Sequence, residues 1–284
     1  MDWLENLRST FLDFGAMGEV LPHMIGTGLK NTLILAVIAT VIGIVLGMIL
    51  AVMGISRSRW LRYPARIYTD IFRGLPEVVT ILLIGQGFAR ISQEIFGATP
   101  YPLGILALSL IAGAYIGEIF RSGIQSVDKS QLEACRALGM SRSSGMRLVV
   151  IPQGIRRVLP ALVNQFISVI KASSLVYFLG LLTSERELFR VGQDAAVLTG
   201  NLSPLLLAGI FYLVITVPLT HLVNYFDDRL RSSRRRPSAP VSGLEEVAAV
   251  NAVSAAPMPT SGGDGTEGTA RTTRTDRTDR TDNE

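Results

Sequence analysis

The chain has 284 residues, of which 48% are hydrophobic and only 18% are charged. Soluble domains usually carry about 25% charged residues, so the composition argues against a wholly soluble protein and indicates that lipid is the solvent for much of the chain. The formal net charge of +4 is informative only when the charges are placed along the sequence. The single cysteine, Cys135, cannot form an internal disulfide, and the two histidines, His23 and His221, lie far apart. We therefore expect no metal site and no cofactor.

The first residues of the chain are acidic, with Asp2, Glu5, Asp13 and Glu19. A secretory signal peptide instead begins with a basic region that an apolar core follows directly. We therefore interpret residues 1–26 as an N-terminal segment that is not a cleaved signal peptide.

Five apolar stretches are long enough to cross a bilayer, which requires roughly 20 apolar residues in a helix. The first contains no charge between Lys30 and Arg57, and the fourth is interrupted only by Lys171. The sequence therefore predicts an all-α integral membrane protein with about five transmembrane helices. The predicted spans are 27–55, 67–90, 101–121, 158–182 and 202–226.

The arginines are concentrated in alternate connections: after the first span, after the third span and beyond the fifth span. The connections after the second and fourth spans mix arginine with acidic residues. Because arginine and lysine accumulate in cytoplasmic loops, this pattern predicts that the N-terminus and residues 1–26 lie outside and the C-terminus lies inside. We expect a multi-pass protein of the bacterial cell membrane.

The cytoplasmic connection between the third and fourth spans begins with a helical pattern. Ser130 and Glu133 fit a capping box, Ser-x-x-Glu. Leu132, Cys135 and Leu138 recur every three residues, which predicts that they share one face of this helix.

A turn and a second short helix are predicted to follow. Gly139 suits the left-handed residue that ends a helix, and Ser141 or Ser143 can begin the next helix. The whole connection, about 128–152, is thus predicted to be a basic, amphipathic helix-turn-helix. From these residues alone, it could cover the bundle or dock on a partner.

The same residues resemble the "EAA" loop of ABC-type import permeases. In that loop Glu-Ala-Ala is followed by a glycine and then by Ile-x-Leu-Pro. Glu133, Ala134 and Cys135 match the first three positions and Gly139 matches the glycine, while 149–152 match the end of the pattern. The departures, such as Cys135 for alanine, are small and apolar.

Further motifs resemble the polar amino-acid branch of these permeases, which takes up histidine, glutamate, glutamine, arginine and opines. The resemblance covers about residues 25–230, and it implies that 27–230 form an ABC type-1 transmembrane domain. The motifs are Arg73-Gly-Leu-Pro76, the pattern of Gly, Tyr, Glu and Arg over 113–125, Leu138-Gly-Met140, Pro152-Gln153 and Lys171-x-Ser-Ser-Leu175.

The resemblance implies a permease subunit of an ATP-driven importer of polar amino acids, whose cytoplasmic loop inserts into a groove on an ATPase. Glu133, Ala134, Gly139 and Pro152 would then couple the permease to that ATPase. The chain itself is not expected to hydrolyse ATP, because none of its three lysines follows a glycine and no phosphate-binding loop is present.

The implied partners are two cytoplasmic ATPase subunits, a second permease subunit (the same chain or a similar one), an extracytoplasmic solute-binding protein and the lipid bilayer. We expect no nucleic-acid partner. The resemblance leaves open which amino acid is carried.

Polar side chains within predicted spans are costly and usually face a cavity or a partner. Lys171 is expected about 20 Å into the fourth span, close to Ser173 and Ser174. These three residues and Glu77, which follows the Gly-Leu-Pro break, are candidates for the translocation path. Pairing of Lys171 with a carboxylate or snorkelling is the alternative. Many family members carry an acid where Ala172 stands here, which separates this chain from the pattern.

Glu118 and Arg121 are three residues apart near the end of the third span, and we expect a structural ion pair between them. Residues 231–284 are rich in Ser, Pro, Gly, Thr and Ala and end in Arg-Thr-Asp repeats, so they are predicted to form a disordered cytoplasmic tail.

Two other classes of function are alternatives to the importer. An ATP-independent carrier often shows two repeated halves with interrupted spans, and no such repeat is present in the sequence. A membrane anchor or sensor would place its working part in the tail, where no motif stands out.

Overall fold

The computed structural model describes residues 2–232, which belong to one compact unit built of helices. The predicted disordered tail lies outside the described residues apart from its first two. In chain order the elements are α1 (Asp2–Phe11), α2 (Phe14–His23), the π-helix η1 (Met24–Leu29), α3 (Lys30–Gly54), α4 (Arg59–Gly74), α5 (Glu77–Gly87), α6 (Ala89–Phe96), α7 (Tyr101–Gln125), α8 (Lys129–Ala137), α9 (Arg142–Gly145), the π-helix η2 (Met146–Val150), α10 (Ile151–Ala172), the 3₁₀ helices η3 (Ser173–Leu179) and η4 (Thr183–Glu185), α11 (Leu188–Thr199) and α12 (Ser203–Ser232).

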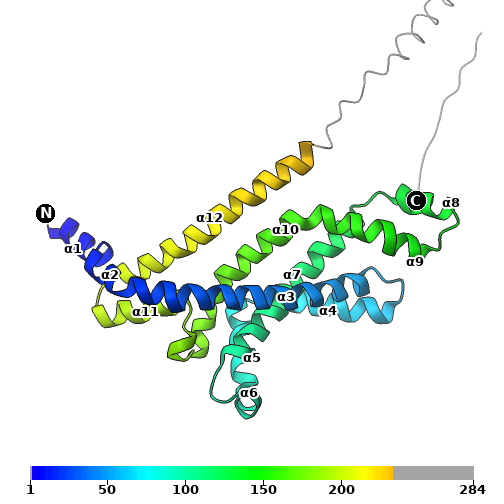
Figure 1. Cartoon of the computed structure of the whole chain (residues 1–284). Helices are drawn as coiled ribbons and strands as arrows, with labels where there is room; N and C mark the ends of the chain where they lie inside the picture. The colour runs from blue at the N-terminus through cyan, green and yellow to red at the C-terminus, as the bar shows by residue number, and fades with distance from the viewer. Residues whose placement is uncertain (1, 233–284) are drawn as a thin grey trace, which may run out of the picture. The chain divides into compact units, whose positions relative to one another are not determined.

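The centre of the bundle is the pair of long helices α3 and α7, which lie against each other over most of their length (Figure 1). Gly43 and Gly47 of α3 face Gly113 and Gly117 of α7. A Cβ atom on Gly47 would lie 2.8 Å from the backbone nitrogen of Gly117. Small residues four apart on both helices let the backbones approach closely, which is a common way of packing helices in lipid.

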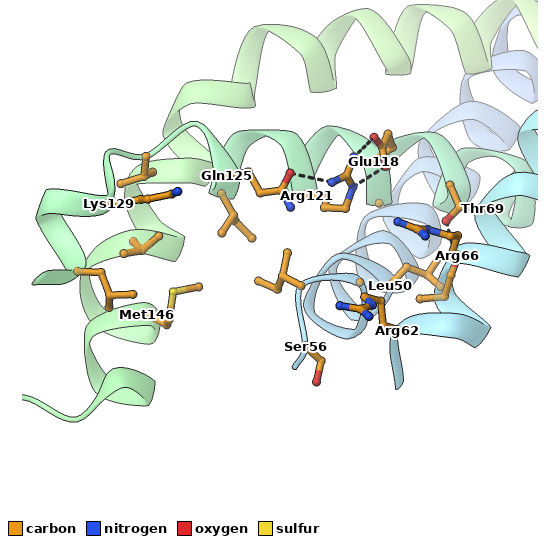
Figure 2. A pocket seen from close by; sticks show the side chains of 18 of the residues that line it. Leu50, Ser56, Arg62, Arg66, Thr69, Glu118, Arg121, Gln125, Lys129 and Met146 are labelled. Carbon is orange, nitrogen blue, oxygen red and sulfur yellow. Dashed lines mark hydrogen bonds and ion pairs between the residues drawn. The ribbon is translucent and has the colours of Figure 1, made fainter. Parts of the chain in front are cut away.

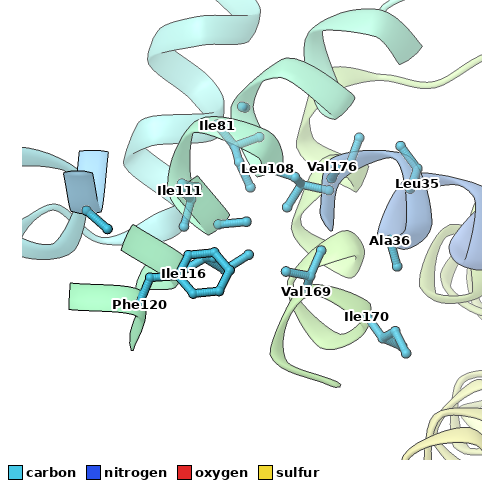
Figure 3. Packing of buried hydrophobic residues seen from close by; sticks show 14 of the residues in the cluster. Leu35, Ala36, Ile81, Leu108, Ile111, Ile116, Phe120, Val169, Ile170 and Val176 are labelled. Atoms are coloured by element: carbon cyan, nitrogen blue, oxygen red, sulfur yellow. The ribbon is translucent and has the colours of Figure 1, made fainter. Parts of the chain in front are cut away.

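The main apolar core surrounds α7, whose buried side chains contact α3, α5 and α10 (Figure 3). Leu108 and Ile116 of α7 are fully buried, together with Leu35 of α3, Ile81 of α5 and Ile170 of α10. The packed positions of α7 therefore lie all around the helix, as expected of a central span.

Other apolar side chains point away from this core. Val45 of α3 is 60% exposed, and Leu213 of α12 is likewise 60% exposed. By length and composition, four helical stretches of the described residues are able to cross a membrane. They are Glu5–Gly54, Tyr101–Gln125, Arg142–Leu179 and Ser203–Tyr225.

The range predicted as the second span, 67–90, is not a single helix, and this prediction was wrong in that respect. The backbone is extended at Leu75 and Pro76, so the range is divided between α4 and α5. Proline disfavours the helical conformation of the residue before it and lacks an N–H group, which ends α4 at Gly74. The eleven residues of α5 extend about 16 Å, roughly half of a bilayer core.

Candidate functional site

The predicted cytoplasmic connection forms a compact corner, which we call the elbow and define as residues 128–150. Its first helix, α8, begins after Asp128, whose carboxylate accepts a hydrogen bond of 2.9 Å from the N–H of Ser130. This hydrogen bond lowers the pKa of the Asp128 carboxyl. The predicted capping box of Ser130 and Glu133 was therefore wrong, because an aspartate two residues earlier occupies the capping position.

The turn of the elbow agrees with the sequence. Gly139 has a φ of +81°, and the N–H of Met140 donates to the carbonyl of Cys135, which is the hydrogen bonding of a left-handed helix end. Ser141 then caps α9 by accepting from the N–H of Ser144 at 3.1 Å. The helix-turn-helix prediction is confirmed in its turn and in the start of its second helix.

Cys135 holds the two helices of the elbow together and is buried, and Leu132 is half-buried. Both contact α9, because a Cβ atom on Gly145 would lie 3.0 Å from Leu132 and 3.1 Å from Cys135. Leu138, which was predicted to share this face, is instead 83% exposed. Each step of three residues falls about 60° short of a full helical turn. Leu138, two such steps after Leu132, therefore does not lie on the packed face.

The proposed coupling residues lie on the opposite surface of the elbow and at its end. Glu133, Ala134 and Gly139 are exposed, and so is Pro152, the second residue of α10. The elbow packs on the last turn of α7 and on the end of α3 through Ile124, Val127, Val150 and Ile55. It therefore connects the ends of several spans while leaving one face open.

A polar pocket lies beside the elbow, between α3, α4, α7 and α8 (Figure 2). On its α7 wall, Arg121 donates from Nε to the Glu118 carboxylate at 2.8 Å and from a terminal nitrogen to Gln125 at 2.7 Å. The predicted ion pair of Glu118 and Arg121 is confirmed.

Two of the four candidate path residues, from distant parts of the chain, interact electrostatically, although they form no salt bridge in the described part of the chain. Glu77 begins α5, and Lys171 is the penultimate residue of α10, yet the lysine charge acts on the Glu77 carboxyl. Lys171 is exposed and Glu77 is half-buried. Their proximity fits both a translocation path and a pairing of the lysine with a carboxylate.

The other two candidates, Ser173 and Ser174, satisfy their hydroxyl groups within the backbone. Ser173 is fully buried and donates to the carbonyl of Ile170, and Ser174 donates to the carbonyl of Lys171, both at 2.7 Å. These hydrogen bonds lie where α10 tightens into η3, so the serines support the segment that presents Lys171.

The opposite end of α3 holds a buried carboxylate that the sequence did not single out. Glu187 is fully buried and caps α11 by accepting from the N–H groups of Phe189 and Arg190, at 2.6 and 2.7 Å. It also accepts from the hydroxyl of Tyr212 at 3.0 Å. Burial raises the pKa of Glu187 to about 7, although these hydrogen bonds oppose the increase.

Side chains of α3 complete this arrangement, which we call the Glu187 cluster: Asn31, Thr32, Glu187 and Tyr212. Thr32 accepts from the N–H of Leu188 at 3.0 Å. Asn31 donates to the carbonyls of Ser184 and Arg186. The cluster thus fastens the loop before α11 to the start of α3.

These features define a helical, multi-pass membrane protein with an exposed corner between two of its spans. The chain belongs to the family of binding-protein-dependent transport system inner membrane components, which matches residues 43–232. The predicted family and the predicted class of permease fold are confirmed, and the chain is a transport subunit rather than an enzyme.

Relatives of known role are similar over most of their length. The arginine transport system permease protein ArtQ of Bacillus subtilis (strain 168) is 33% identical over 222 residues, which cover 78% of this chain and 99% of ArtQ. The glutamate/aspartate import permease protein GltK of Escherichia coli O6:H1 is 34% identical over 225 residues, which cover 76% of this chain and 97% of GltK.

Solved structures agree with this assignment. An amino acid ABC transporter, crystallised with histidines, has a chain that is 34% identical and superposes with a TM-score of 0.68, covering 77% of this chain and 99% of its own. A chain of the MetNI methionine ABC transporter is 20% identical with a TM-score of 0.60, over 77% of this chain and 98% of its own, and supports the fold alone.

Proposed function

We propose that this chain is the permease subunit of an ATP-driven importer of polar amino acids. The family membership supports the transport role, and the names of the relatives, which carry arginine or glutamate and aspartate, support the substrate class. The observation that carries the proposal is the exposed face of the elbow, formed by Glu133, Ala134 and Gly139.

The proposed partners are two cytoplasmic ATPase subunits, a second permease of the same or a similar sequence, and an extracytoplasmic solute-binding protein. The family description, a binding-protein-dependent system, supports the last of these. The distribution of arginines supports an elbow on the cytoplasmic side and residues 1–26 outside.

The proposed coupling works through rigid connections. A force applied to α8 reaches α7 across a short link, since α7 ends at Gln125 and α8 begins at Lys129. It reaches α10 through the contacts of α8 with α9 and η2, since η2 continues directly into α10 at Ile151. A subunit that binds the face around Glu133 can therefore move two spans together.

In the proposed path, Glu77 and Lys171 present opposite charges to a solute that itself carries an ammonium and a carboxylate group. Ser173 and Ser174 hold the turn from which Lys171 projects. Charged side chains within membrane-spanning segments usually mark a solute or ion pathway, which supports this proposed path.

The coupling is tested by Glu133→Arg and Gly139→Asp in the assembled transporter. We expect amino-acid uptake to fall by about tenfold or more, because a reversed charge at a protein interface costs several kcal/mol, while membrane insertion is unchanged. Co-purification of the ATPase subunit should weaken in the same variants.

The matched control is Gln93→Arg, which adds a charge at an exposed position of α6 away from the elbow. It should transport as the wild type does. Normal uptake and normal ATPase binding in both elbow variants would refute the proposed docking face.

A further inference from the structure

The pocket beside the elbow has a volume of about 930 Å³, within the range of sites that hold small ligands. Its walls come from the end of α3, one face of α4, the last turns of α7, and the elbow. Figure 2 shows Arg62 and Arg66 on one side, Lys129 on the other, and the pair of Glu118 and Arg121 along a third wall.

The pocket carries an excess of three positive charges. Its basic side chains are Arg62, Arg66, Arg73, Arg121, Lys129 and Arg142, and its acidic side chains are Asp70, Glu118 and Asp128. Such an excess within a confined pocket raises the local concentration of anions.

Several of these charges already have partners. Arg121 is held by Glu118, Asp128 accepts from the start of α8, and Arg73 lies 5.5 Å from the ring centre of Tyr115.

The remaining cations of the pocket are available to a ligand, although the charge of Arg66 also acts on the Glu118 carboxylate. They form no ion pair with any residue in the described part of the chain. These residues are Arg62, Arg66, Lys129 and Arg142.

The sequence of α4 directs its arginines into this pocket. Arg62, Arg66 and Arg73 line it at intervals that keep them on one helix face. Trp60 and Ile67, also on α4, are 90% and 56% exposed. They belong to an apolar surface of α4 that suits contact with lipid. The arginines therefore lie at the end of the membrane spans and point away from the acyl chains. Headgroup phosphates lie at this level of a bilayer.

We propose that this pocket binds a phosphate-bearing anion through Arg62 and Arg66, with Lys129 and Arg142 closing on it from the elbow. The planar guanidinium group offers two parallel N–H donors that match a phosphate, and the lysine adds a point charge. The source of the phosphate is either the headgroup of an anionic phospholipid or a soluble phosphate compound. In either case the ligand links α4 to the elbow across the pocket.

The test uses the full-length permease purified in a neutral detergent. Its melting temperature is measured with phosphatidylglycerol, with phosphatidylcholine as the uncharged comparison, and with inorganic pyrophosphate. We expect phosphatidylglycerol or pyrophosphate to raise the melting temperature, and the active compound identifies the source. The rise should be lost in the double variant Arg62→Gln and Arg66→Gln.

The control is Arg59→Gln with Arg156→Gln, which removes two exposed arginines that do not line the pocket. This control should keep the full rise. If the first double variant fails to fold by circular dichroism, Lys129→Gln with Arg142→Gln on the opposite wall decides the question. The proposal is overturned if neither compound raises the melting temperature of the wild type, or if the pocket variants show the same rise as the control.

Discussion

The two ends of α3 use polar side chains in opposite ways. At its N-terminal end, Glu187 is fully buried, and its carboxylate accepts hydrogen bonds from two backbone N–H groups and a tyrosine hydroxyl. At its C-terminal end, the elbow buries Cys135 and Val150 and leaves Glu133 and Gly139 exposed. Polar groups that are hydrogen-bonded within the chain stabilise its structure, whereas polar groups that remain exposed are available to a partner.

The largest expected effect is the difference in the free energy of unfolding between substitutions of Glu187 and of Glu133. Glu187→Ala should lower the free energy of unfolding by about 2–4 kcal/mol, because it removes a helix cap and leaves buried N–H and O–H donors without an acceptor. Glu133→Ala should change it by less than about 0.5 kcal/mol, as expected of an exposed residue, and should reduce uptake instead. Denaturation in detergent and uptake in reconstituted vesicles measure the two effects. Equal losses of stability would remove the distinction.

The pH dependence of stability also tests the burial of Glu187. Because burial raises the pKa of Glu187 from 4.5 to about 7, the folded state binds a proton more tightly than the unfolded state. Its contribution to stability is therefore greatest below pH 4.5 and declines as the pH rises to about 7, by about 3 kcal/mol. Thermal unfolding of the wild type and of Glu187→Gln should show this decline in the difference between the two proteins. A difference that is constant with pH contradicts the assigned burial.

The close packing of α3 against α7, between the two ends of α3, gives the next largest effect on stability. Gly47→Val should destabilise the protein by about 1–3 kcal/mol, because the added atoms overlap the backbone of α7. Gly209→Val is the matched control, since a Cβ atom at Gly209, within α12, meets nothing within 4 Å. Melting temperatures in detergent test this difference, and an equal response would show that α3 and α7 do not approach closely.

The smallest effect concerns the turn of the elbow. A side chain at Gly139 has open space around it, so the cost of a substitution comes from the left-handed backbone, about 1–2 kcal/mol. Gly139→Val should therefore weaken the elbow more than Gly139→Asn, because asparagine tolerates this conformation. Hydrogen exchange of the amides of α8 and α9 reports the difference. Identical exchange in the two variants would argue against a strained turn.

The elements that the sequence predicted correctly depend on local chemistry. The long helices α3, α7 and α12 follow from long apolar stretches. The turn at Gly139 and the cap at Ser141 follow from the conformations that these residues prefer. The break between α4 and α5 follows from the Gly-Leu-Pro sequence that precedes Glu77, although the predicted span 67–90 ran across it.

The elements that were missed depend on contacts between distant residues. Glu187 stands in a charged segment and gives no sign of burial until Thr32 and Tyr212, on other helices, are placed beside it. The electrostatic interaction of Glu77 with Lys171 likewise depends on the packing of α5 against η3, which follows α10 directly. The exposed position of Leu138 arises because α8 ends at Ala137 and the three-residue spacing drifts around the helix.

The most direct test compares labelling at the two ends of the molecule. Cys135 is a poor probe because it is buried, so a Cys135→Ala background is combined with Leu138→Cys in the elbow or Leu198→Cys in α11; these leucines are 83% and 86% exposed. A membrane-impermeant maleimide should label Leu138→Cys only in inside-out vesicles and Leu198→Cys only in right-side-out vesicles. Labelling of the elbow in right-side-out vesicles would place it on the side away from ATP and would contradict the proposed coupling.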